Sequence, residues 1–299
     1  MARKDEFFSV LLALAFLTHV LQAQCVQDNR SSKTSGLMIA ELTITGTHSF
    51  NSTELARLTR KLTGSCVDEN QEELGERLRA LFQDEGYFQA EVQNVHIKVN
   101  DPLALPKPVT VEVEVKEGRR IKVGEIKFVG NHVFSASDLR RHFALNKGDL
   151  FARNKIGNGL EGVRNLYVAD GFMDWVAIPD TELSDGTVDL IVSVVEGRQY
   201  RMGKLEIFAK KEAVEQLRSQ WEIAEGAVFD RTYVGKYIDK NRPLLPPGFN
   251  QTDVQVVRNC RDSSVEVRLP LDGTDPRSQS APKDIDCEPS GKAGQSKEN

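Results

Sequence analysis

Three glycines within six residues are the first feature of this chain that could bind a ligand. Residues 157–162 read Gly-Asn-Gly-Leu-Glu-Gly, the G-x-G-x-x-G spacing that holds a dinucleotide pyrophosphate. Such a loop needs a strand that ends at the first glycine, so that amides at the next helix start face the phosphates. Instead, apolar residues recur at helical spacing through the glycines, at Ile156, Leu160, Val163 and Leu166. We therefore predict a helix with the glycines mostly on its polar face, where they could also admit a neighbouring backbone.

The histidines and carboxylates form no recognisable catalytic set. No two histidines have metal-ligand spacing, and no cysteine has a nearby histidine that would activate it as a nucleophile. His48 and His132 follow two similar strand patterns, so we interpret them as turn residues. The sequence predicts a protein without enzymatic activity, metal or cofactor.

Four cysteines in an exported chain could form two disulfides, for which three pairings exist. The cysteines are Cys25, Cys66, Cys260 and Cys287, and the pairs nearest in sequence are Cys25 with Cys66 and Cys260 with Cys287. The alternative is that some of them are free thiols. None has the C-x-x-C spacing of a metal or redox site.

The N-terminal residues resemble a secretory signal peptide. Arg3 and Lys4 precede an apolar run from Phe7 to Leu21, which is shorter than the roughly 20 residues that span a bilayer. We predict cleavage near Ala23, giving a signal over 1–23 and a linker over 24–36. Cys25 offers a lipoprotein alternative, which Gln24 before it disfavours.

The net charge of −5, with both signs interspersed, argues against a nucleic-acid-binding face.

One strand pattern occurs three times. The stretches LMIAELTI at 37–44, IKVGEIKF at 121–128 and YRMGKLEI at 200–207 alternate apolar residues with period two. In each, the alternation slips by one residue, at Ala40, Gly124 and Gly203, which is typical of a β-bulge. A shared irregularity is stronger evidence of repetition than shared regularity.

Further landmarks recur behind each of these strands. A valine-rich strand begins at Val109, Val188 and Val265, and a glycine before an aromatic residue recurs at Gly86, Gly171 and Gly248. The glycines suit helix C-termini in the left-handed conformation. Helical patterns precede them, with Ser52 or Thr53 and Ser135 or Ser137 as candidate N-caps and with Leu74, Leu78, Leu81 and Phe82 on one stripe. The order in each repeat is therefore β-α-α-β-β, in an α+β fold.

These repeats resemble the polypeptide-transport-associated (POTRA) domains of the outer-membrane protein assembly and surface-antigen family. The likeness rests on EGRRIKVGEIKFVGNHVFSASDLRRHF at 117–143, NLYVADGF at 165–172 and VDLIVSVVEGRQYRMGKLEIF at 188–208. It implies three tandem POTRA-like domains at 37–118, 119–198 and 199–272, each a three-stranded mixed sheet covered by two helices. The polar residues 273–299 are predicted to be disordered and are too few for a membrane β-barrel. We therefore expect either a POTRA protein that lacks the barrel or a fragment of a longer reading frame.

The resemblance also implies a function that depends on sheet edges. In the family the second strand lies exposed at an edge, where an extended client chain can add as a further strand. Here these strands correspond to about 91–99, 174–178 and 253–257, with candidate client-binding residues Trp175, Val176, Ala177, Ile178, Asp253 and Val254. Trp175 could instead pack under the helices.

The implied partners are outer-membrane proteins or their unfolded precursors, and subunits of the outer-membrane β-barrel assembly machinery. We expect a periplasmic protein, associated with the membrane only indirectly and not with nucleic acid. A structural spacer or scaffold of the cell envelope that binds no client is the alternative.

Overall fold

The computed structural model describes residues 36–67, 71–271, 284 and 287. The predicted signal peptide, almost all of the linker, Cys25 and the tail apart from residues 284 and 287 lie outside these residues. The described chain forms two compact units. Residues up to Glu125, with Leu145–Lys155 and Leu183–Val188, form one, and Ile126–Ala144, Ile156–Glu182 and the residues from Asp189 onward form the other.

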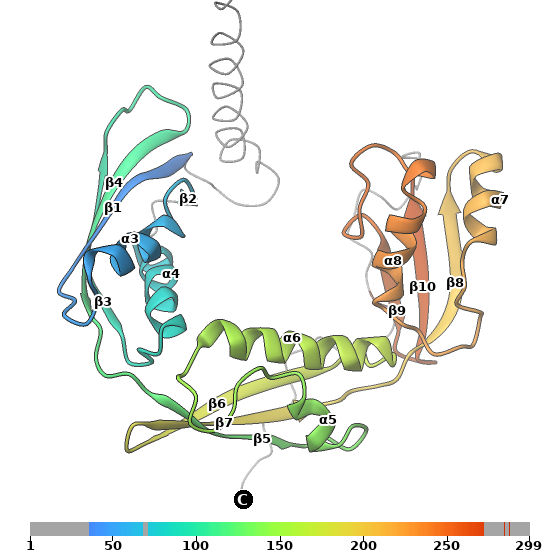
Figure 1. Cartoon of the computed structure of the whole chain (residues 1–299). Helices are drawn as coiled ribbons and strands as arrows, with labels where there is room; N and C mark the ends of the chain where they lie inside the picture. The colour runs from blue at the N-terminus through green and yellow to red at the C-terminus, as the bar shows by residue number, and fades with distance from the viewer. Residues whose placement is uncertain (1–35, 68–70, 272–283, 285–286, 288–299) are drawn as a thin grey trace, which may run out of the picture. The chain divides into compact units, whose positions relative to one another are not determined.

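The first sheet has four strands in the order β2-β1-β4-β3. Its members are β1 (Leu37–Thr45), β2 (Cys66–Val67), β3 (Glu91–Val99) and β4 (Lys107–Lys116), with the helices α3 (Ser52–Arg60) and α4 (Gln71–Asp84) packed against it (Figure 1). β4 pairs parallel with β1 and antiparallel with β3. The short β2, which the sequence pattern did not predict, adds a fourth strand to the expected three.

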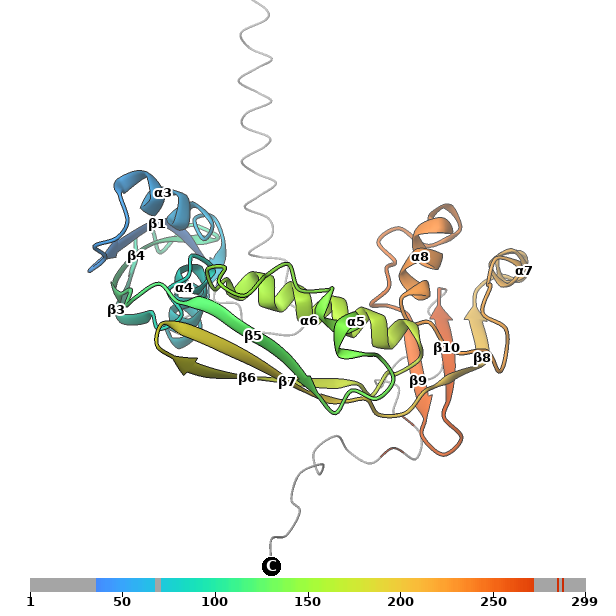
Figure 2. The ribbon, with the colours of Figure 1, turned by 60° about the horizontal axis from the view of Figure 1, so that its bottom comes forward.

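The other two sheets have three strands each. The middle one, in the order β5-β7-β6, contains β5 (Lys122–Val129), β6 (Val176–Ser184) and β7 (Thr187–Val195), with helices α5 (Ala136–Arg140) and α6 (Arg153–Ala169). The third, in the order β8-β10-β9, contains β8 (Arg201–Phe208), β9 (Gln255–Asn259) and β10 (Ser264–Pro270), with α7 (Lys211–Ser219), α8 (Tyr233–Lys240) and a 3-10 turn at Arg242–Leu244. Figure 2 shows α6 running along the middle sheet. The predicted α+β fold of three β-α-α-β-β repeats is confirmed.

Two of the three predicted bulges are visible in the strand pairing. Ile39 pairs with Val109 and Glu41 with Thr110, so Ala40 is the extra residue of β1. In the third sheet the pairing passes from Met202 directly to Lys204, which leaves Gly203 as the extra residue of β8. A common bulge at the same position supports the common origin of the strands in one repeated unit.

The helix ends agree with the sequence prediction in part. Leu74, Leu78, Leu81 and Phe82 are buried as expected, and Gly86 and Gly171 follow α4 and α6 with φ angles of 99° and 82°. Gly248 also has a positive φ, 83°, but it lies beyond the 3-10 turn at Arg242–Leu244 and not at the end of α8. Ser135 is the N-cap of α5. The prediction of Ser52 or Thr53 for α3 was wrong because the helix begins one residue earlier, where Asn51 accepts a hydrogen bond from the Glu54 amide and Glu54 accepts one from the Asn51 amide.

We predicted that the glycines of α6 lie mostly on its polar face, but two of the three pack against other side chains. Gly159 is buried, and a Cβ atom there would lie 2.4 Å from Cδ1 of Phe143. At Gly162 a Cβ atom would lie 2.8 Å from Nδ1 of His142, whereas Gly157 faces open space. The neighbours are side chains of the segment after α5 rather than a backbone. Two of the three glycines therefore provide the surface against which that segment packs.

This packing predicts opposite effects of two alanine substitutions in one helix. Gly159→Ala should lower the free energy of unfolding by about 1–3 kcal/mol, because its methyl group overpacks the Phe143 ring. Gly157→Ala should raise it by about 0.5–1 kcal/mol, because alanine favours an exposed helix position and meets no neighbour. Urea unfolding followed by Trp175 fluorescence, in a Trp221→Phe background, isolates the middle repeat. Shifts of the same sign in both variants would contradict the packing.

Candidate functional site

The second strand of each repeat lies at the edge of its sheet, where backbone groups can pair with another chain. β3, β6 and β9 are the terminal strands in the three sheet orders. The predicted range for the first of them coincides with β3, whereas β6 and β9 begin two residues later than expected. The three edge strands differ in how regularly they expose backbone hydrogen-bonding groups. This difference decides which of them can pair with an added strand.

The edge strand β3 is interrupted by a bulge. Its pairing with β4 shifts between Gln93 and His96, and Asn94 has a φ of 48°. The Asn94 side-chain amide donates a hydrogen bond of 2.7 Å to Glu114 on the neighbouring strand. A bulged edge twists away from a regular ladder, so β3 is a poor template for strand addition.

Asp253 and Val254, two of the predicted client-binding residues, precede β9 rather than belong to it. Val254 is only 6% exposed and packs in the core of the third repeat. The Asp253 carboxylate accepts a hydrogen bond of 2.8 Å from the Asn250 amide and so closes the preceding turn. Neither residue presents an exposed strand edge.

β6 presents exposed apolar side chains at its start. Val176 and Ile178 are 49% and 57% exposed, and Ala177 between them is half-buried. Proline lacks an amide hydrogen, so Pro179 must stand where no ladder bond to β7 is donated. The Thr181 amide, two residues on, donates instead to the Asp180 carboxylate. We infer that odd-numbered residues of β6 face outward, which leaves Ala177 as the outward-facing amide donor next to Trp175.

Trp175 is half-buried immediately before β6. Its indole stacks on the Tyr167 ring with centroids 5.5 Å apart, and Tyr167 in turn meets the edge of Phe134. The indole Nε1 is buried without a hydrogen-bond partner among the described residues. The packing that we predicted as an alternative for Trp175 is thus present. The indole is held in place by this packing, next to the exposed Val176 and Ile178.

Glu196 holds the hydroxyl group of Tyr167 by a hydrogen bond. Its Oε1 accepts hydrogen bonds of 2.8 Å from the Tyr167 hydroxyl and from the amides of His132 and Val133. Glu117 occupies the same place in the first repeat and accepts from the amides of His48 and Ser49. His48 and His132 are therefore turn residues, as predicted. Burial opposes the ionisation of Glu196, but the hydrogen bonds from Val133 and Tyr167 lower the pKa of its carboxyl overall.

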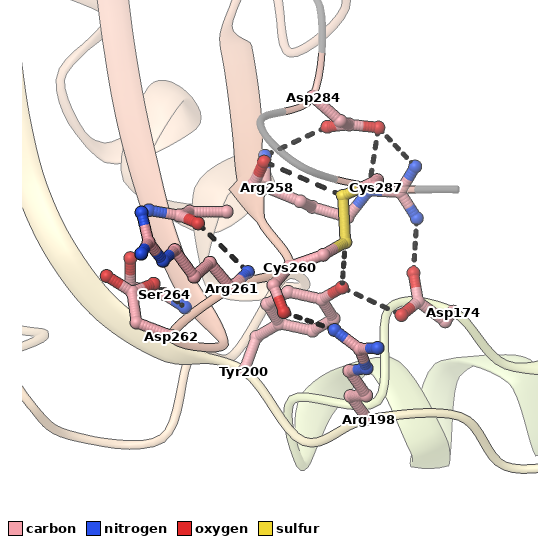
Figure 3. The surroundings of a disulfide bond; sticks show 11 residues. Asp174, Arg198, Tyr200, Arg258, Cys260, Arg261, Asp262, Ser264, Asp284 and Cys287 are labelled. Atoms are coloured by element: carbon pink, nitrogen blue, oxygen red, sulfur yellow. Dashed lines mark hydrogen bonds and ion pairs between the residues drawn. A yellow bond between two sulfur atoms is a disulfide. The ribbon is translucent and has the colours of Figure 1, made fainter. Parts of the chain in front are cut away.

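A second set of contacts joins one repeat to the next. The Gly86 carbonyl accepts a hydrogen bond of 2.8 Å from the Ile121 amide, and the Gly171 carbonyl accepts one of 2.8 Å from the Tyr200 amide. Beside the latter, the Tyr200 hydroxyl donates to Asp174 at 2.7 Å. Asp174 also pairs with Arg258, whose guanidinium binds Asp284 (Figure 3). No local sequence pattern indicated this network.

A disulfide joins Cys260 to Cys287, one of the pairings that the sequence left open. None of the cysteines in the described part of the chain is free. Cys25 lies outside the described residues, so its pairing with Cys66 stays a prediction. Over the described ranges, no group of three metal-ligating side chains comes together, and no helix has the length and apolar character to cross a membrane.

The sequence matches a known family over two of the three repeats. A family model described as the surface antigen variable number repeat, POTRA, matches residues 37–118 and 121–197. The chain belongs to this POTRA family. The crystal structure of Haemophilus influenzae BamA POTRA3-5 has the same fold, with a TM-score of 0.58 and 20% identity over 78% of this chain and 94% of that one.

Two curated relatives are similar over parts of their length. The outer membrane protein assembly factor BamA of Neisseria meningitidis is 30% identical over 112 residues, 33% of this chain and 14% of that protein. A putative outer membrane protein assembly factor of Treponema pallidum is 20% identical over 246 residues, 76% of this chain and 29% of that protein. The chain thus spans less than a third of these relatives.

The lowered pKa of Glu196 predicts an acid-sensitive site around Trp175. A depressed folded-state pKa means that the stabilisation is complete above the unfolded-state pKa of about 4.3 and is lost as the pH falls through the folded-state value. Trp175 fluorescence in a Trp221→Phe background should therefore report destabilisation below about pH 4.3. Glu196→Gln should flatten this acid dependence and cost about 1 kcal/mol at neutral pH.

Glu182→Gln, which alters an exposed glutamate on β6, is the matched control and should leave the profile as in the parent. If Glu196→Gln retains the full acid-dependent step, Glu196 does not hold this site.

Proposed function

We propose that the chain is a non-enzymatic periplasmic binding module that serves outer-membrane protein assembly or secretion. It would receive extended segments of outer-membrane proteins, their unfolded precursors or partner assembly subunits as an added strand on β6. Membership of the POTRA family and the names of the relatives in Neisseria and Treponema support the setting. They also support a location in the periplasm, with only indirect membrane association.

The start of β6 is the observation that carries this proposal. Val176 and Ile178 are exposed on the edge strand of the middle sheet, next to the stacked Trp175. An incoming strand would bond to the Ala177 amide and carbonyl and to the Pro179 carbonyl, because main-chain groups alone set the affinity in strand addition. Its apolar side chains would lie along Val176 and Ile178. Such recognition requires extended backbone rather than one sequence, which suits unfolded clients of many sequences.

A structural spacer is the second candidate. The connections at Gly86 and Gly171 each join consecutive repeats by main-chain hydrogen bonds, which would suit a scaffold that holds partners apart. A spacer needs no accessible strand edge, so the two functions differ in what β6 contacts.

Site-specific photocrosslinking separates the two candidates. A benzophenone side chain at Ile178 in the full chain should trap an unfolded outer-membrane protein precursor. The control position is Leu103, a loop residue that is 92% exposed and equally apolar, so it measures nonspecific attachment. Equal yields at both positions, or none at either, would contradict strand addition and favour the spacer.

The inferred direction of the Ala177 amide gives a sharper prediction. Ala177→Pro removes the outward donor while leaving the ladder to β7 intact, so it should weaken precursor binding about five-fold, the equivalent of one hydrogen bond of about 1 kcal/mol. Ala177→Ser keeps the amide and should bind as the parent does. Affinity is measured by fluorescence anisotropy of a labelled precursor. Unchanged binding by Ala177→Pro would overturn the proposed mode.

A further inference from the structure

The edge strand β9 is covered by two residues that are far from it in sequence. The amide of Arg258, the fourth of the five residues of β9, donates a hydrogen bond of 2.9 Å to Oδ1 of Asp284. An edge amide that bonds to a carboxylate is not directed at the neighbouring strand β10, so residues 256 and 258 face outward. In a strand of only five residues, covering Arg258 removes most of the ladder that an added strand could use.

The side chain of Arg258 strengthens the same cover. Its Nε donates to Oδ2 of Asp284 at 3.0 Å, and its two terminal nitrogens pair with Asp284 and Asp174. Burial opposes the ionisation of Asp284, yet the hydrogen bonds from Arg258 lower the pKa of its carboxyl overall. Figure 3 shows the guanidinium lying between the two carboxylates. Asp284 thus satisfies both the backbone and the side chain of Arg258.

The Cys260–Cys287 disulfide holds Asp284 at this place. Cys260 directly follows β9, and Cys287 is three residues beyond Asp284, at a sequence separation of 27 from Cys260. Asp284 and Arg258 belong to one chain, and a covalent bond so close to their ion pair shortens the loop between them and raises the effective concentration of the carboxylate. The side chains of this ion pair are 27% exposed, so solvent still weakens their attraction, and the disulfide is what makes the cover persistent.

We propose that Asp284 and Cys287 form a redox-controlled cover on β9, which keeps a second strand-accepting edge closed until the Cys260–Cys287 disulfide is reduced. The proposal rests on the strand addition proposed above and adds its regulation. It also defines the partner: an extended segment with an aspartate or glutamate opposite Arg258, because that carboxylate must replace Asp284 on the guanidinium.

The chemical step is an ordinary thiol–disulfide exchange. A dithiol reductant attacks one sulfur, the Cys260–Cys287 S–S bond breaks, and the reductant closes to its own disulfide. Two electrons pass to the protein sulfurs, and two protons complete the thiols of Cys260 and Cys287. Asp284 is then held only by its ion pair and hydrogen bonds with Arg258, so the fraction of time that it spends bound to Arg258 falls.

The first test measures the cover itself, independently of any client. In the full chain, amide hydrogen exchange at Arg258 should be slow in the oxidised protein. It should become at least about ten-fold faster after dithiothreitol treatment, in Cys260→Ser/Cys287→Ser and in Asp284→Ala. Asp284→Ala removes the acceptor of the Arg258 amide but keeps the disulfide, and so guards against a folding defect of the serine variant. The control Asp101→Ala removes an exposed carboxylate in the first repeat and should change nothing at Arg258. Exchange that is equal in all forms overturns the cover.

The second test measures acceptance of a strand. The probe is a fluorescent octapeptide of alternating valine and threonine with one central aspartate, and its twin has asparagine there. An Ala177→Pro background weakens the contribution of β6. In this background the aspartate peptide should bind the Cys260→Ser/Cys287→Ser variant at least about ten-fold more tightly than it binds the oxidised protein, and more tightly than the asparagine peptide binds that variant.

The two tests distinguish a failure of the β9 proposal from a failure of the proposed function. Faster exchange without peptide binding at β9, while β6 still binds precursor, overturns β9 as an acceptor edge and leaves the proposed function standing. Absence of precursor binding at β6 defeats the proposed function, whatever the exchange at Arg258 shows.

Discussion

The succession of repeats depends on a glycine with a positive φ just beyond the second helix of the first and middle repeats. At Gly171 the chain turns out of α6 and its carbonyl meets the Tyr200 amide, where the next repeat begins. A Cβ atom at Gly171 would lie 2.7 Å from the Tyr200 carbonyl oxygen, and the left-handed conformation disfavours any side chain for a second reason. Gly86 makes the corresponding bond to Ile121. The same residue therefore ends a helix, starts the edge-strand segment and links to the following sheet.

Everything at the candidate site follows from where that turn directs the chain. Directly after Gly171, Asp174 reaches Tyr200 and Arg258, while Trp175 stacks on Tyr167. Glu196 ties Tyr167 to the turn after β5. The exposed start of β6 is thus supported on one side by an aromatic stack and on the other by an ion-pair chain that leads to the cover on β9. The edges of the repeats are not equivalent: β3 carries a bulge, β9 a cover, and β6 only a proline.

The sequence predicted the elements well because strands and helices leave periodic apolar patterns. The bulges at Ala40 and Gly203 were predictable for the same reason, since each breaks a period of two. Gly159 was misplaced because a glycine has no side chain whose polarity could mark a buried face, and only the three-dimensional position of Phe143 shows its role. The cover on β9 was not predictable either. Asp284 meets Arg258 beside the Cys260–Cys287 disulfide, whose pairing the sequence left open. One aspartate in a polar segment that also contains Asp286 gives no local signal.

Hydrogen exchange at the Ala177 amide tests the central claim most directly. The account predicts that an unfolded outer-membrane precursor slows exchange at Ala177 in the full chain, because the incoming strand accepts this hydrogen bond, while exchange at Leu103 is unchanged. Binding of the precursor without any slowing at Ala177 would contradict strand addition to β6.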